Sequence, residues 1–251
     1  MTALLEVREL THRFGSVVVV DELSFDVAEG EALGIVGPNG AGKTTLLNLI
    51  AGDLRAQRGE IRFDGRAITD LPANARCRSG IGRTSQIPRP FTGLTAFENV
   101  LVGATFGAGK RADGGGREIL AVDALERAGM TAKANVPASE LTLLERKRLE
   151  LARALATRPR LLLLDEIAGG LTDDEIDVLV ATVLDIRASG VTIVWIEHVV
   201  HALLSVVDRI MAIDFGRLLI VGDPHEVMSS PAVRNVYLGE DVEPDLDRVA
   251  R

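Results

Sequence analysis

The residues with the most specific chemistry are a glycine-rich run that ends in a lysine and two threonines, at positions 37–45. The run reads Gly-Pro-Asn-Gly-Ala-Gly-Lys-Thr-Thr and fits the pattern G-x-x-x-x-G-K-[ST]. Glycines let several backbone N–H groups point at one anion, the lysine adds a positive charge for the β- and γ-phosphates, and the hydroxyl can bind Mg²⁺. We therefore expect a nucleoside triphosphate to bind here. The expected contact residues are Gly37, Pro38, Asn39, Gly40, Ala41, Gly42, Lys43, Thr44 and Thr45.

An acidic pair forms the second candidate site. Asp165 and Glu166 follow four consecutive leucines at 161–164, which are typical of a buried strand. Ligands bind at the carboxyl ends of strands in open α/β sheets. We expect Asp165 to hold Mg²⁺, directly or through water, and Glu166 to accept a proton from an attacking water molecule. The alternative is a solvated acidic turn after a core strand.

Two further polar residues lie in less specific contexts. Gln86 stands where strand-rich sequence changes to helix-rich sequence, a hinge from which its amide could reach Mg²⁺ and the γ-phosphate. His198 follows the apolar run at 191–196. Taken alone, a glutamine in such a place is usually a surface residue, and a histidine after a strand is more often packed or solvent-facing than catalytic.

Alternating strands and helices are expected to position these residues. Strand-like runs occur at 4–10, 17–20, 24–27, 33–36, 61–63, 160–164, 191–196 and 210–213. Helical spacing occurs at 44–51, 118–128 and 142–156, and Thr172 with Glu175 forms a capping-box signature for another helix. The segment 107–116 is rich in glycine and is expected to be a surface loop. Strands that alternate with helices predict a parallel sheet covered by helices.

Composition narrows the class of protein. The chain has 251 residues, 47% hydrophobic residues and a formal net charge of −8, which indicates a globular protein and disfavours a nucleic-acid partner. One cysteine excludes an internal disulfide and fits a reducing compartment. The sequence shows no secretory signal pattern, and no apolar run approaches the ~20 residues needed to span a bilayer. We expect a cytoplasmic protein that can dock on a membrane protein.

Taken together and in this order, the motifs resemble the ATPase subunit of an ABC transporter over nearly the whole chain. The matching residues are Phe14, 37–45, Gln86, 141–154, 161–166, 170–172 and His198. The resemblance implies that ATP and Mg²⁺ are the cofactors and that Phe14 stacks on adenine. It implies catalytic roles for Lys43, Gln86, Glu166 and His198, with Thr44, Gln86 and Asp165 as the metal ligands. His198 would contact the γ-phosphate, and Gln86 would sense it and couple to the membrane partner.

The resemblance also implies the fold. We expect an α/β protein with a P-loop NTPase core, in which a mostly parallel sheet is flanked by helices, together with an antiparallel β part and a helical subdomain. Residues 1–251 would form a single domain. Its parts would be an ATP-binding core lobe (1–86 and 159–222), a helical subdomain (87–158) and a C-terminal helical tail (223–251).

Within the family, the segments 141–155, 80–84, 96–100 and 237–239 resemble the branched-chain amino-acid importer type. That type implies a second ATPase subunit, two membrane permease subunits and a place on the inner face of the cell membrane. The solute would be a branched-chain amino acid or a related small polar molecule.

One motif departs from the family pattern. The signature Leu-Ser-Gly-Gly-Gln is replaced by Leu141-Thr142-Leu143-Leu144-Glu145. In the family this motif closes on ATP held by the second ATPase. Thr142 keeps the hydroxyl and is a candidate contact, but the leucines add bulk and Glu145 brings negative charge toward phosphate. We expect an asymmetric heterodimer, rather than a homodimer, with one strong and one weak site. The alternative is that both leucines face the core of a helix whose start is shifted.

Two other classes of function compete with this interpretation. A GTPase-like switch is disfavoured because the chain has no Asn-Lys-x-Asp guanine-binding motif. A non-transport or catalytically weak ABC-type regulatory module is suggested by the altered signature, but the intact Glu166 argues against it.

Overall fold

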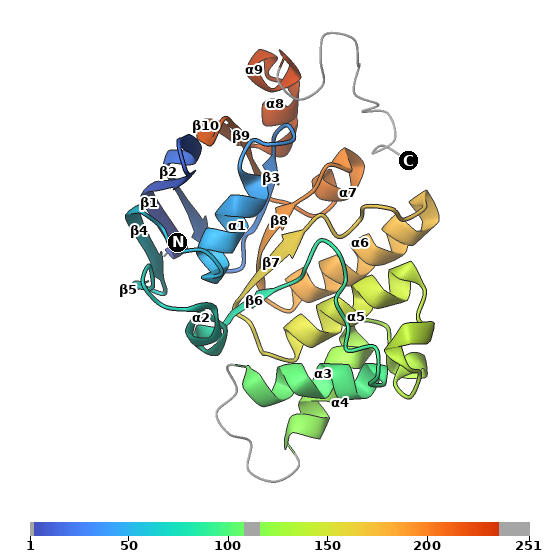
Figure 1. Cartoon of the computed structure of the whole chain (residues 1–251). Helices are drawn as coiled ribbons and strands as arrows, with labels where there is room; N and C mark the ends of the chain where they lie inside the picture. Colours follow the sequence, from blue (N-terminus) through green and yellow to red (C-terminus); the bar gives the residue numbers. More distant parts are fainter. Residues whose placement is uncertain (1–2, 108–115, 236–251) are drawn as a thin grey trace. The chain divides into compact units, whose positions relative to one another are not determined.

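The computed structural model describes residues 3–107 and 116–235 (Figure 1). The chain divides into two compact units. Unit 1 is formed by Met1–Pro72 and Thr192–Arg251, and unit 2 by Ala73–Val191. Within the described residues, no helix has both the length and the apolar character needed to cross a membrane.

An antiparallel sheet makes up the first part of unit 1. Its order is β2-β1-β4-β5, and the strands are β1 (Ala3–Phe14), β2 (Val17–Ala28), β4 (Arg58–Phe63) and β5 (Arg66–Ala67). Leu5, Val7 and Leu10 of β1 are fully buried, as are Val27 of β2 and Ile61 of β4. Polar residues alternate with these positions along the strands, so burial of one face stabilises the sheet.

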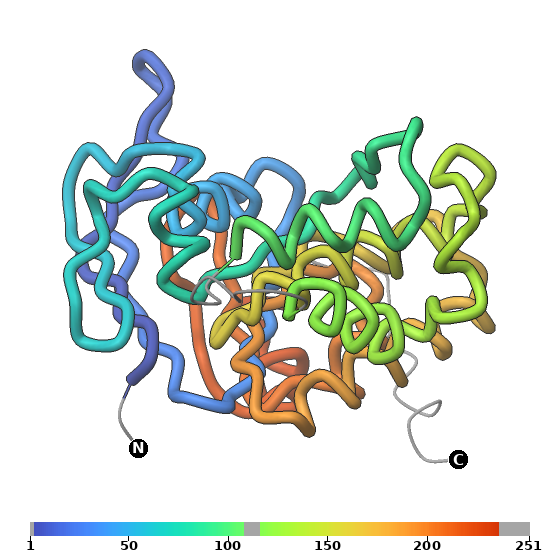
Figure 2. Tube along the Cα trace, turned by 90° about the horizontal axis from the view of Figure 1, so that it is seen from below, coloured from blue at the N-terminus to red at the C-terminus, as the bar shows by residue number. Residues whose placement is uncertain are grey.

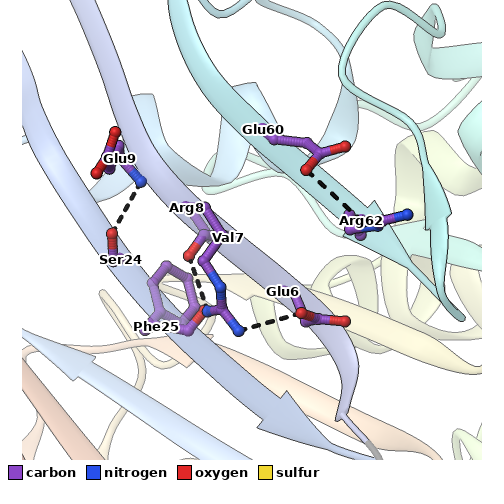
Figure 3. Close-up of polar contacts among 8 residues, drawn as sticks. All are labelled: Glu6, Val7, Arg8, Glu9, Ser24, Phe25, Glu60 and Arg62. Carbon is purple, nitrogen blue, oxygen red and sulfur yellow. Dashed lines mark hydrogen bonds and ion pairs between the residues drawn. The ribbon is translucent and has the colours of Figure 1, made fainter.

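A β-bulge interrupts β1, and Figure 3 shows the polar contacts around it. Glu9 has a left-handed φ of 46°, and its backbone N–H donates to Ser24 Oγ at 2.8 Å. Beside it, Arg8 pairs with Glu6 at 3.1 Å and donates to the carbonyl of Phe25 at 3.3 Å. Exposed ion pairs of this kind contribute little stability. The bulge changes the direction of the strand. It also explains why apolar and polar residues no longer alternate strictly along β1 after Val7.

The second sheet of unit 1 carries the phosphate-loop candidate. In it β3 (Ala32–Val36) runs parallel to both β8 (Thr192–Ile196) and β9 (Arg209–Asp214), and β10 (Arg217–Gly222) is antiparallel to β9. Every residue of β3 and β8 is buried, which explains their continuous apolar sequences. The helices of this unit are α1 (Lys43–Ala51), α7 (Val200–Leu204), α8 (Pro224–Ser229) and α9 (Pro231–Val233).

In the part of unit 2 that the structure describes there are one parallel strand pair and most of the helices. The strands are β6 (Ile81–Arg83) and β7 (Leu161–Asp165). The helices are α2 (Ala73–Ser79), α3 (Ala96–Phe106), α4 (Gly116–Arg127), η1 (Thr131–Lys133), η2 (Ala138–Glu140), α5 (Leu143–Leu155) and α6 (Asp173–Ala188). Helices α3, α4 and α5 pack against one another, and Figure 2 shows them side by side in green to yellow.

These elements confirm the predicted α/β class, with parallel strands, an antiparallel β part and a helical part. The capping box at Thr172 is present at the start of α6. The runs at 17–20 and 24–27 form one strand, because β2 continues through Asp21 and Glu22 with local irregularities. The predicted loop at 107–116 is bounded by α3 and α4, and its residues 108–115 lie outside the described part.

Candidate functional site

The phosphate-loop candidate connects β3 to α1 in unit 1. A Cβ atom at Gly37 would lie 2.2 Å from the carbonyl oxygen of Ile213, and one at Gly42 would lie 2.3 Å from that of Val19. Both distances are too short for any side chain. The loop therefore passes directly against the backbones of β2 and β9, and its glycines are required by this packing.

Lys43 begins α1 and is only 7% exposed. Its Nζ donates to the carbonyl oxygens of Gly37 and Pro38, at 2.6 and 2.9 Å. The ammonium group is thus held by the loop itself. Because the N-cap residue is Gly42, no side chain caps the first turn of this helix. Helix N–H groups and a lysine at one place favour binding of an anion such as a phosphate.

Unit 1 also contains four of the other predicted residues. Thr44 and Thr45 are half-buried in the first turn of α1. Phe14 ends β1 with an exposed ring that meets His12 edge to face, at 4.8 Å between ring centroids. His198 follows β8, is exposed, and lies with its Nδ1 3.4 Å from Oε1 of the buried Glu197.

Unit 2 brings together the predicted carboxylates and the glutamine. Asp165 ends β7, and its buried Oδ2 accepts from Arg83 Nη2 at 3.1 Å. Gln86 Nε2 donates to Glu166 Oε2 at 2.6 Å. Glu166 has a φ of 47°, an uncommon conformation for a residue with a side chain, and such strain clusters at functional sites. Arg83, on the neighbouring strand β6, is a contact that the sequence analysis did not assign.

The donor set fits Mg²⁺ bound jointly by protein and phosphate. Among residues 3–107 and 116–235, no three His, Cys, Asp or Glu side chains cluster in a way that could hold a metal ion. Mg²⁺ usually takes one or two protein oxygens and completes its shell with phosphates and water. Within unit 2, Gln86 offers an amide oxygen and Asp165 a carboxylate oxygen, which match that preference, and within unit 1 Thr44 offers a hydroxyl.

The altered signature segment starts α5 with a complete capping box. Thr142 is the N-cap, its Oγ1 accepts from the Glu145 N–H at 3.3 Å, and Glu145 Oε2 accepts from the Thr142 N–H at 2.9 Å. Lys133 Nζ pairs with Glu145 Oε1 at 2.9 Å. The negative charge expected of Glu145 is therefore balanced by an adjacent cation and two interactions with the helix start.

The two leucines do not behave as core residues. Leu143 is 42% exposed and Leu144 is half-buried. The alternative expectation, that both face the core, is wrong for Leu143. The helix begins immediately after Thr142, so Leu143 lies in its first turn.

These contacts change the titration of Glu145. Hydrogen bonds from Lys133 Nζ and from the Thr142 backbone N–H lower the pKa of this carboxyl below its usual range. The unfolded chain then binds a proton at higher pH than the folded chain. The ionised carboxyl therefore stabilises the fold above the ordinary pKa of about 4.3. That contribution is lost as the pH falls through the lowered pKa.

Replacing Glu145 by glutamine is expected to lower the free energy of unfolding at pH 7 by about 0.5–1 kcal/mol, because the ion pair and charged cap are weakened. The difference should close at an acid pH below the lowered pKa. Urea denaturation at both pH values measures it, with the exposed Glu126→Gln on α4 as control. A difference that stays constant with pH would contradict the assignment.

Comparison with known proteins identifies the family. Residues 20–169, more than half of the chain, match the family described as ABC transporter. The chain belongs to this family.

Its relatives cover nearly its full length. It is 38% identical to the high-affinity branched-chain amino acid transport ATP-binding protein BraF of Pseudomonas aeruginosa, over 94% of this chain and 98% of BraF. It is 36% identical to the corresponding protein LivG of Salmonella typhimurium, over 94% and 98%. It is 34% identical to the lipopolysaccharide export system ATP-binding protein LptB of Acidithiobacillus ferridurans, over 96% and 98%.

A solved structure agrees with the sequence comparison. The crystal structure of a nucleotide-free ATP-binding cassette from an ABC transporter superposes with a TM-score of 0.87 at 28% identity. The match covers 95% of this chain and 100% of that one. This chain is therefore an ATP-binding and ATP-hydrolysing subunit of the ABC transporter family, whose ATP-binding subunits dimerise and work with membrane permeases.

Proposed function

We propose that this ABC ATPase drives a membrane importer for branched-chain amino acids or a related small polar solute, from the cytoplasmic face of the membrane. The observation that carries the proposal is the near full-length similarity to BraF and LivG. LptB, a relative of similar identity, belongs to a lipopolysaccharide export system. The solute class is therefore a proposal about this chain and is open to direct test.

The residues of unit 1 would bind the nucleotide. Lys43 and the N-terminal amides of α1 would bind the phosphates, and Phe14 would stack on adenine. In this role the carbonyls of Gly37 and Pro38 hold the ammonium group before ATP arrives. Such preorganisation reduces the entropy lost on binding. His198 would donate a hydrogen bond to the γ-phosphate.

Glu166 would act as the general base for the attacking water. Its hydrogen bond to Gln86 Nε2 fixes the carboxylate, and it leaves the carbonyl oxygen as the Gln86 atom suited to a metal. Thr44, Gln86 and Asp165 would hold Mg²⁺, which neutralises phosphate charge when bound. Arg83 would orient the Asp165 carboxylate through its 3.1 Å ion pair.

The start of α5 supports an asymmetric dimer. Its capping box engages the Thr142 hydroxyl as an acceptor, and the Glu145 carboxylate occupies the helix N-terminus. A phosphate held by a partner ATPase would meet the exposed Leu143 and a helix N-terminus already capped by Glu145, instead of glycine backbone. Losing one preorganised donor costs about 10²–10³ in rate. We infer a heterodimer whose second ATPase carries the usual Leu-Ser-Gly-Gly-Gln signature. ATP held in this chain's own phosphate loop would be covered by that signature and would form the strong site.

Turnover measurements test the asymmetry. The chain alone is expected to hydrolyse Mg·ATP slowly, and mixing it with its partner ATPase should raise the rate per bound ATP by about 10²-fold or more. Equal rates per site in both preparations would refute the asymmetry. Absence of turnover in both preparations would favour the alternative of a regulatory module. The capping box at the start of α5 also fits that alternative.

Isolation from membranes tests the importer role. Mild-detergent purification of the tagged chain is expected to recover two permease subunits and a second ATPase, since the chain would lie peripherally on the membrane. Transport of a branched-chain amino acid by the reconstituted complex, dependent on ATP on the cytoplasmic side, would support the proposed solute. Recovery of the chain without any membrane protein would contradict the role.

A further inference from the structure

The turn between β9 and β10 contacts the phosphate loop and β2 at the same time. The N–H of Gly216 donates to the carbonyl of Ala41, in the phosphate loop, at 3.0 Å. The carbonyl of Gly216 accepts from the N–H of Asp21, in β2, also at 3.0 Å. Arg217 adds an ion pair to Asp21 at 2.7 Å. One residue of the turn thus bonds both the loop and the strand beside it.

This junction admits no side chain at Gly216. A Cβ atom there would lie 2.5 Å from the carbonyl oxygen of Val19 and 3.0 Å from Cα of Val20. These are backbone atoms, which cannot move aside as the end of a side chain can. The same carbonyl of Val19 lies 2.3 Å from a Cβ built on Gly42. β2 is therefore the common support of the turn and of the residue before Lys43.

The strand before the turn contacts the other end of the loop. The carbonyl oxygen of Ile213, in β9, lies 2.2 Å from a Cβ built on Gly37. Ile213 and Gly216 thus meet the loop at Gly37 and Ala41, near its beginning and its end. Between them Phe215 is 83% exposed and has a φ of 43°, which is costly for a bulky side chain. The strained residue therefore lies in the turn that positions the Gly216 amide.

We propose that Gly216 is a positioning residue for ATP binding, which braces the phosphate loop from outside the nucleotide site. The inference rests on the proposed function, in which this loop holds the ATP phosphates. Because the N–H groups of the loop must point at one anion, a small displacement of Ala41 misdirects them. Bracing from β9 and β2 keeps the loop in its binding geometry in the absence of ligand.

The test compares Gly216→Ala with Gly65→Ala. Gly65 is a matched control because it follows Asp64 in another hairpin turn, with φ values of 52° and 70° for the pair, against 43° and 76° for Phe215 and Gly216. A Cβ at Gly65 would have nothing within 4 Å. Both variants therefore suffer similar backbone strain, and only Gly216→Ala disturbs the brace.

Gly216→Ala is expected to raise the Kd for Mg·ATP by about tenfold or more, while Gly65→Ala stays within about twofold of the native protein. Titration calorimetry gives the Kd, and urea denaturation shows whether both variants lose comparable stability. A purely structural role would lower stability and leave the Kd unchanged, which would overturn the proposal. An equal rise in Kd for both variants would also overturn it.

A milder pair of variants applies if Gly216→Ala does not fold. Arg217→Ala removes the ion pair that ties the turn to β2, and Arg55→Ala removes another 2.7 Å ion pair of unit 1, to Asp70. Only the first is expected to raise the Kd, by about two- to fivefold. No difference between them would contradict the brace. Failure of the native protein to bind Mg·ATP would instead reject the proposed function itself.

Discussion

Glu166→Gln is expected to lower the ATP turnover of the proposed heterodimer by about 10²–10⁴-fold and to leave Mg·ATP affinity within a few-fold of the native value. The amide has the shape of the carboxylate and can still accept from Gln86 Nε2, but it cannot take a proton from the attacking water. Single-turnover phosphate release gives the rate, and calorimetry gives the affinity. The variant should therefore accumulate as an ATP-bound species.

Asp177→Asn on the exposed face of α6 is the matched control, since it also replaces a carboxylate by an amide within unit 2. This change should leave turnover unchanged. Turnover of Glu166→Gln within about threefold of the native rate would reject Glu166 as the general base, because that contribution is worth orders of magnitude.

Lys43→Ala is expected to weaken Mg·ATP binding by about 10²-fold or more, because charge-assisted hydrogen bonds to phosphate are among the strongest polar contacts. The change also removes the two bonds that Nζ donates to the loop carbonyls of Gly37 and Pro38. Both effects act on the same loop, so the affinity should fall more than in any other single variant proposed for unit 1. Calorimetric titration measures it.

Arg66→Ala controls for the loss of one positive charge in unit 1, because Arg66 is exposed in the short strand β5. Its affinity for Mg·ATP should equal that of the native protein. Unchanged affinity in Lys43→Ala would contradict the contact assigned to the lysine, while similar losses in both variants would point to net charge alone.

Local sequence predicted the elements that carry the site. The continuous apolar run before residue 37 is the buried strand β3, the four leucines before Asp165 form most of β7, and helix α1 begins one residue before its predicted start. These predictions hold because burial, glycine freedom and helix spacing act over a few neighbouring residues. The expected roles of Lys43 and Glu166 remain predictions for the experiments above.

Contacts between distant residues could not be predicted in the same way. Arg83 meets Asp165 because β6 pairs with β7, and Gly216 meets Ala41 because β9 pairs with β3. Neither contact could be predicted from the spacing of residues along the chain. The capping box at the start of α5 differs from these two contacts, because Thr142 and Glu145 already show the capping-box spacing in the sequence. The helix at 142–156 and the altered signature were predicted for this segment, but the capping box was not.

Titration of the purified native chain with Mg·ATP tests most directly whether residues 37–45 hold a nucleotide. We expect saturable heat with a stoichiometry of one ATP per chain, accompanied by a rise in the thermal unfolding midpoint as expected for a ligand of the folded state. No heat and no thermal shift at millimolar Mg·ATP would contradict it.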